Sequence, residues 1–118
     1  MESAESLREI AGQELSAVEF VTDYLQLRFD GPLLTLYEWP SVLLSEFSVS
    51  FGEPGYRDAL CAQIGETVED ATLEEGDSLT VRFESGVVLA VSLREEDMAG
   101  PEGGVFTASG DPADQIEF

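Results

Sequence analysis

Hydrophobic and polar residues alternate in two stretches of the chain that resemble each other. In "YLQLRFDG" (24–31), Leu25, Leu27 and Phe29 fall on one face of a strand and polar residues on the other. The pattern returns in "SLTVRFESG" (78–86). Alternation with a period of two predicts a strand, and the Asp-Gly and Ser-Gly pairs that follow predict tight turns.

Each of these strands is followed by a run that is apolar on both faces, "LLTLYEW" at 33–39 and "VVLAVSL" at 87–93. This pattern predicts strands covered on both sides, by a helix or by a second subunit. An imperfect strand is expected at 15–20. The stretch 45–51 is expected to close the first meander, with Phe47, Val49 and Phe51 pointing inward, and a short strand is expected near Val105 and Phe106.

Helical spacing precedes each group of strands. The first helix is expected over roughly 3–11 and the second from Pro54 to about residue 64. Both run into a glycine, Gly12 and Gly65, which is the usual residue at a helix C-terminus. The second helix carries an apolar stripe made of Tyr56, Leu60, Cys61 and Ile64.

These elements predict an α+β domain built from two helix-plus-antiparallel-meander units, α-β-β-β twice. We expect a single domain over 1–118, with unit one at about 1–52, unit two at about 53–107 and a loop or tail at 108–118. The matching stretches suggest an internal duplication. The alternative is coincidence, because alternating strands with glycine turns look alike.

The charge of the chain is strongly one-sided. It has 25 acidic residues against five arginines, no lysine and no histidine, and a formal net charge of −20. Such a surface repels nucleic acid and anionic membranes, and it attracts a basic protein. Solubility or adaptation to a salty cytoplasm would give the same composition.

Several features predict a cytoplasmic location. No apolar run approaches the ~20 residues that span a bilayer, and the start "MESAESLREI" is acidic and polar, unlike a signal peptide. The single cysteine, Cys61, excludes an internal disulfide and fits a reducing compartment.

The composition also argues against catalysis. Without histidine there is no His-dependent triad and no His-ligated metal site, and without lysine there is no P-loop. Cys61 lies on the apolar stripe and is expected to be a buried, inert thiol. Carboxylate pairs have no specificity as a signal among so many acids, and the acidic loops lack the spacing of a calcium-binding EF-hand. We therefore expect no enzyme, no cofactor and no metal site.

The most concentrated negative charge lies in "ETVEDATLEEGD" (66–77), with a second group of acids at 95–97. The run 66–77 could equally protect a sheet edge against stray strand pairing. Trp39, in "LYEWP", is either a core residue or an interface anchor. The candidate partner-binding residues are Glu66, Glu69, Asp70, Glu74, Glu75, Asp77, Glu95, Glu96, Asp97 and Trp39.

These features predict a non-enzymatic cytosolic domain that binds a protein partner with a basic surface, as immunity and inhibitor proteins do. Two alternatives stay open. One is a domain that binds a small ligand or a divalent cation. The other is a structural homo-oligomer in which the doubly apolar strands face a second copy.

Two stretches, "PGYRDALCAQIGETV" and "SLREEDMAGPEGGVF", resemble a group of small bacterial proteins of unknown function. The matching residues are Gly65, Phe83, Gly86, Gly100, Pro101 and Glu102. The resemblance implies a cytosolic bacterial protein and no particular activity. The likeness to immunity proteins is one of composition and size only.

Overall fold

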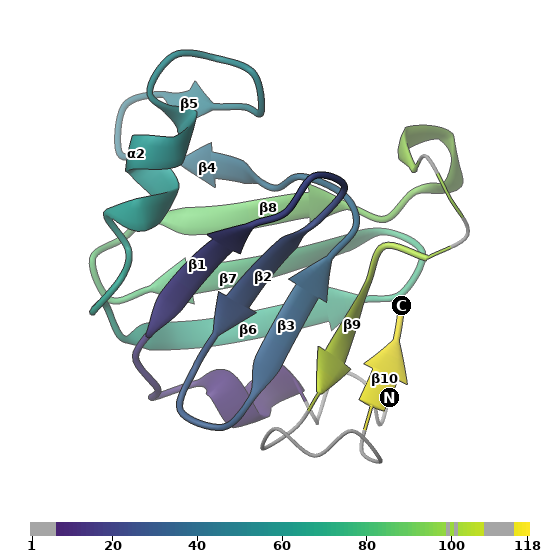
Figure 1. Cartoon of the computed structure of the whole chain (residues 1–118), viewed down its shortest axis with the longest axis horizontal. Coiled ribbons are helices and arrows are strands. Elements are labelled where there is room, and N and C mark those ends of the chain that lie inside the picture. Colours follow the sequence, from purple (N-terminus) through teal and green to yellow (C-terminus); the bar gives the residue numbers. More distant parts are fainter. Residues whose placement is uncertain (1–6, 99, 101, 108–114) are drawn as a thin grey trace.

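The computed structural model describes residues 7–98, 100, 102–107 and 115–118. Its strands form two antiparallel sheets of five strands each, lying one over the other with their strands crossing (Figure 1). The front sheet contains, in spatial order, β1 (Ala17–Phe20), β2 (Leu25–Arg28), β3 (Leu33–Leu36), β9 (Gly104–Thr107) and β10 (Gln115–Glu117). The back sheet contains β5 (Ser48–Val49), β4 (Ser41–Leu43), β8 (Val88–Ser92), β7 (Ser78–Phe83) and β6 (Val68–Glu74).

Helices contribute little to this architecture. The described residues contain one short α-helix, α2 (Tyr56–Cys61), and two 3-10 turns, η1 (Arg8–Ile10) and η2 (Glu95–Asp97). The predicted α+β class is therefore wrong, because the fold is mostly β. No helix among the described residues has the length and hydrophobicity that a membrane span requires.

The predicted pair of helix-plus-meander units, with its internal duplication, is also wrong. After β3 the chain leaves the front sheet, and β4 pairs with β8 of the back sheet, with Val42 opposite Leu89. After β8 it returns, and β9 pairs with β3, with Leu34 opposite Phe106. Each half of the chain thus divides its strands between the two sheets, three in one and two in the other, so neither half is a self-contained helix-plus-meander unit. The continuous strand expected at 33–39 ends at Leu36, since the chain crosses between the sheets there.

The two similar stretches of sequence are the central strands of two meanders. β2 pairs with β1 and β3, and β7 pairs with β6 and β8. The prediction that Leu25, Leu27 and Phe29 share a face is confirmed, since all three are buried, as are Leu79 and Val81 of β7. Both are central strands with one face on the core, and this shared environment explains the similar patterns.

The apolar stripe expected on the second helix is only partly right. Tyr56, Leu60 and Gln63 are buried, whereas Ile64 is 45% exposed and Cys61 is exposed. Residues 56 and 60, four positions apart, lie on one face of the helix, and residue 61 is turned about 100° away from residue 60. The prediction that Cys61 is a buried thiol is therefore wrong.

The inward orientation expected for the phenylalanines at 45–51 is wrong as well. β5 consists of two residues only, and of the three side chains just Val49 is buried. Phe47 is 63% exposed and Phe51 is 52% exposed. A strand this short cannot hold the alternation over seven positions, so both rings lie at the surface.

The last strand is held beside β9 by backbone and side-chain contacts. Ile116 of β10 lies opposite Phe106, and the backbone N–H of Phe118 donates to the Gly104 carbonyl at 3.1 Å. The side chains of Glu102 and Glu117 are hydrogen-bonded to each other. Three effects raise the pKa of Glu102 above its ordinary 4.5. The largest is this hydrogen bond, followed by burial and by repulsion from the Glu117 charge.

This carboxyl pair makes stability depend on pH. Because the pKa of Glu102 is raised on folding, its contribution is complete below the unfolded pKa and is lost as the pH rises through the folded pKa. Replacing Glu102 with glutamine keeps a hydrogen-bond donor facing Glu117 and removes the repulsion. We expect Glu102→Gln to raise the urea midpoint at pH 7, with the gain shrinking as the pH falls and the carboxyl of Glu102 becomes protonated.

The matched control is Glu95→Gln, which removes the same charge from an exposed position. A general effect of net charge would raise the midpoint equally in both variants. An equal gain, or no gain for Glu102→Gln at pH 7, would contradict the pairing.

Candidate partner-binding surface

Four aromatic rings from four separate segments meet at the end of the sandwich that carries α2. Phe20 ends β1, Trp39 lies where the chain crosses between the sheets, Phe51 follows β5 and Tyr56 begins α2. The Trp39 ring stacks on Phe51 with centroids 4.4 Å apart and on Phe20 with centroids 6.2 Å apart, at interplanar angles of 13° and 14°. Tyr56 meets Phe51 edge-on at 5.8 Å. We call these four residues, together with Arg57, the aromatic surface.

The loop between β5 and α2 places two of these rings. Gly52 and Gly55 have φ values of 94° and 86°, so the chain turns twice through the left-handed region that glycine adopts without strain. The carboxylate of Glu53 accepts a hydrogen bond from the Ser50 backbone N–H at 2.6 Å and fixes the first turn. The two turns bring Phe51 and Tyr56 into contact across a short sequence distance.

Tyr56 anchors the surface to the core. Its ring is buried, and its hydroxyl donates a 2.6 Å hydrogen bond to the Pro40 carbonyl, one residue beyond Trp39. Burial raises the pKa of Tyr56, so the hydroxyl stays protonated and keeps this bond in ordinary buffers. The loop that carries Phe51 and the crossing that carries Trp39 are therefore tied together.

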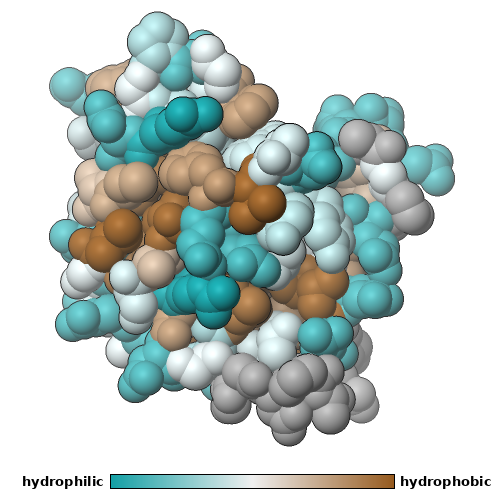
Figure 2. Space-filling view, viewed as in Figure 1, coloured by the Kyte–Doolittle hydropathy of each residue, from teal (hydrophilic) through white to brown (hydrophobic). Residues whose placement is uncertain are grey.

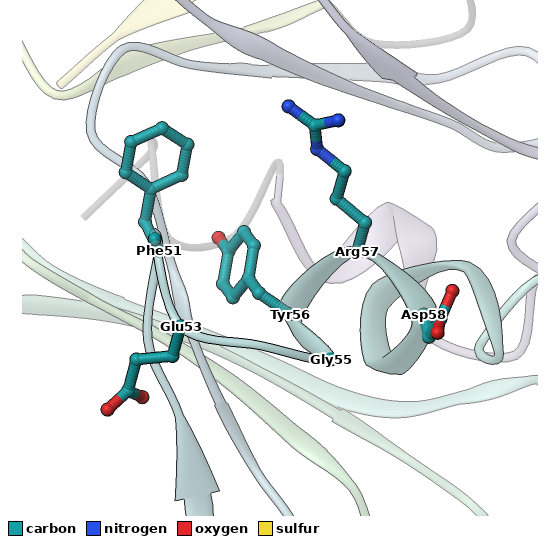
Figure 3. A pocket seen from close by; sticks show the side chains of 7 residues that line it. Phe51, Glu53, Gly55, Tyr56, Arg57 and Asp58 are labelled. Atoms are coloured by element: carbon teal, nitrogen blue, oxygen red, sulfur yellow. The ribbon is translucent and has the colours of Figure 1, made fainter.

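Two hollows border the aromatic surface and share Phe51 and Arg57. The first, of about 310 Å³, is lined by Phe51, Gly52, Glu53, Gly55, Tyr56, Arg57 and Asp58. The second, of about 200 Å³, is lined by Phe20, Val21, Thr22, Trp39, Phe51 and Arg57. Figure 3 shows the Phe51 ring and the Arg57 side chain on either side of Tyr56.

Hydrophobic side chains continue from these hollows over the front sheet. Figure 2 shows them gathered beneath α2, over β1 and the strands beside it. Val18, Phe20 and Trp39 are partly buried here and pack against the core. Phe51, which is half exposed, is part of this area. Its ring is therefore continuous with hydrophobic residues that pack against the core and is not an isolated exposed side chain.

Arg57 supplies a positive charge beside the rings. Its guanidinium lies 5.6 Å from the centroid of the Phe20 ring, a distance at which a cation is attracted to the negative face of an aromatic ring. Asp58 and Glu53, which line the first hollow, carry exposed carboxylates.

The structure separates the predicted acidic contact residues into two groups. Glu66, half-buried, precedes β6, and Glu69 lies at an irregularity near the start of that strand. Glu74 ends β6, about 17 Å from Glu69 at the rise of an extended strand, and precedes Glu75 of the second group. Asp70 is exposed between them on β6, which is an edge strand of the back sheet.

The second group lies where β8 ends. Arg94 Nε contacts the Asp77 carboxylate at 3.2 Å, and the Ser92 hydroxyl donates to Asp97 at 2.6 Å. This brings the β6–β7 turn, with Glu75 and Asp77, beside η2, which comprises Glu95, Glu96 and Asp97. Within the described ranges, no three His, Cys, Asp or Glu side chains are grouped so that they could hold a metal ion.

Trp39 does not join the predicted acids. It contacts Phe20 and Phe51 near α2, which lies on the left in Figure 1, whereas the coil that contains η2 projects on the right. The contact role predicted for the acids stays a prediction.

Sequence reasoning did not identify Phe20, Phe51, Tyr56 and Arg57 as members of the aromatic surface. One signal was available for Phe51. It is followed directly by "GEPG", a sequence rich in turn-forming residues, and turns lie at the surface. No comparable signal marked Phe20, because its partner rings come from distant parts of the chain.

The chain matches no protein-family model, and no curated protein or solved structure is significantly similar to it. The resemblance to small bacterial proteins therefore stays a prediction.

Proposed function

We propose that this chain is a non-catalytic domain that binds a protein partner with a basic surface, and that the aromatic surface is where the partner docks. The observation that carries the proposal is the stack of Trp39 on Phe51, in which Phe51 is 52% exposed beside two hollows. Tryptophan, tyrosine and arginine are the residues most enriched at the energetic centres of protein interfaces.

The arrangement of the site supports this role. The rings are fixed by the core beneath them and by the bond from Tyr56 to Pro40, so little order has to be imposed on binding. Two hollows at the sides of one exposed ring give a partner's side chains a place to insert. Such a rigid aromatic centre loses less conformational entropy than a mobile loop would.

The charge of the chain indicates the kind of partner. A formal net charge of −20 produces a field that accelerates encounter with a positively charged protein and disfavours an acidic one.

The site does not support a catalytic role. The Tyr56 hydroxyl is bonded to the Pro40 carbonyl. Glu102, the other described group with a shifted pKa, lines neither hollow.

Site-specific photocross-linking in living cells tests the proposal. We expect a photoreactive phenylalanine analogue at position 51 to give a discrete adduct with a basic protein, and the yield in lysate to fall as salt is added. The control is the same analogue at Thr72, an exposed position on β6. Identical adducts from both positions, or none from position 51, would contradict the proposal.

A further inference from the structure

The Phe51 ring is engaged on one side only. One face stacks against Trp39 with centroids 4.4 Å apart, and Tyr56 meets it edge-on. With 52% of the residue exposed, the remaining ring surface faces the solvent at the hollow of about 310 Å³. That volume lies at the lower end of the range for ligand pockets and suits a single inserted side chain.

The walls of this hollow favour a cation. Glu53 and Asp58 contribute two carboxylates against the one guanidinium of Arg57. An aromatic face attracts positive charge, and the net charge of the whole chain adds to that attraction. Anionic side chains are disfavoured by all three of these features.

The molecule already holds one guanidinium in this way. Arg57 lies over the Phe20 ring, and it borders both hollows. Phe20, one ring of the aromatic surface, is thus already paired with an arginine of this chain. Phe51 stacks on Trp39, and no cation of the described residues lies over its ring.

We infer that the hollow beside Phe51 receives an arginine side chain of the basic partner, stacked on the exposed part of the Phe51 ring and attracted by the carboxylates of Glu53 and Asp58. This assignment rests on the proposed function and names the partner's anchoring group. Arginine fits better than lysine because its planar guanidinium stacks on a ring face. A lysine ammonium is more strongly hydrated and cannot stack.

Trp39 is the only tryptophan in the chain and stacks on Phe51, so its fluorescence reports on the hollow directly. The probes are three short peptides that carry one central arginine, lysine or citrulline and are otherwise uncharged. Citrulline has nearly the shape of arginine without the charge. We expect a saturable fluorescence change with the arginine peptide, about 10-fold weaker binding of the lysine peptide, and no saturation with citrulline.

Variants of this chain locate the binding. We expect Phe51→Ala to abolish the response to the arginine peptide and Glu53→Gln to weaken it about 5-fold. Phe47→Ala should leave it unchanged, since Phe47 is 63% exposed and lines neither hollow. Circular dichroism checks that each variant is folded.

Equal responses to arginine and citrulline, or an unchanged spectrum with the arginine peptide, would overturn the assignment. The cross-linking result separates this failure from that of the proposed function. If position 51 still forms a specific adduct while the arginine peptide is inert, the partner docks through another group. If both experiments fail, the surface does not bind a basic protein.

Discussion

Replacing Phe83 with alanine is expected to lower the free energy of unfolding by about 3–5 kcal/mol, the usual cost of removing a fully buried aromatic side chain. Phe83 is 0% exposed and ends β7, where it lies opposite Val68 of β6. Its backbone N–H donates to the Val87 carbonyl at 2.9 Å and closes the turn to β8. The cavity would therefore lie between strands held in place by the backbone and could collapse only in part.

Urea unfolding followed by circular dichroism measures this loss. Phe47→Ala is the matched control, because the same side chain is removed from a position that is 63% exposed. We expect the control to change stability by less than about 0.5 kcal/mol. Similar losses in the two variants would show that Phe83 does not fill the core as described.

A single added methyl group at Gly104 is expected to cost about 3 kcal/mol, at the upper end of the range for overpacking. A Cβ at this position would collide with the backbone carbonyl of Thr35 and would lie 2.7 Å from the Phe118 ring. Thr35 belongs to β3, which pairs with β9, so the collision cannot be relieved by turning a side chain. Either β9 moves away from β3 or the Phe118 ring leaves its place.

Gly100→Ala is the control for this variant. An added Cβ there meets no atom of the described residues within 4 Å. Thermal unfolding should show a marked loss for Gly104→Ala and an unchanged midpoint for Gly100→Ala. Equal midpoints would contradict the close approach of β3, β9 and Phe118.

Individual strands can be predicted from the sequence, but which strands pair with each other cannot. The alternation in 24–31 and 78–86 identified β2 and β7 because a central strand has one face on the core throughout its length. The short strand expected near Val105 and Phe106 is confirmed as β9. The pairing of β9 with β3, and that of β4 with β8, were not predictable in this way. Each of β4 and β9 is three or four residues long and is placed by pairing with a strand from the other half of the chain.

The helices were overestimated for a related reason. The stretch after Pro54 has helical spacing, but only Tyr56–Cys61 is an α-helix, and its buried residues are Tyr56 and Leu60, not Cys61. Spacing alone does not say which residues of a short helix touch the sheet. Part of the predicted first helix, residues 3–6, lies outside the described residues.

The aromatic surface could be predicted only in part. Trp39 was recognised as a candidate anchor from its residue type, but its stacking partners Phe20 and Phe51 are 19 and 12 positions away in the chain. Phe51 was expected inside because it continues the alternation of Val49. β5 has only two residues, so the alternation does not extend to Phe51, and its ring lies at the surface. The length of β5 is known only from the structure.

The most direct test of the docking surface is the affinity of the cross-linked partner, once purified, for this chain and its variants. Titration at low salt, followed by Trp39 fluorescence, should show binding to the wild type and about 10-fold or more weaker binding to Phe51→Ala, as expected for an anchoring aromatic residue. Phe47→Ala should bind as the wild type does. Equal affinity for the wild type and Phe51→Ala would contradict the account.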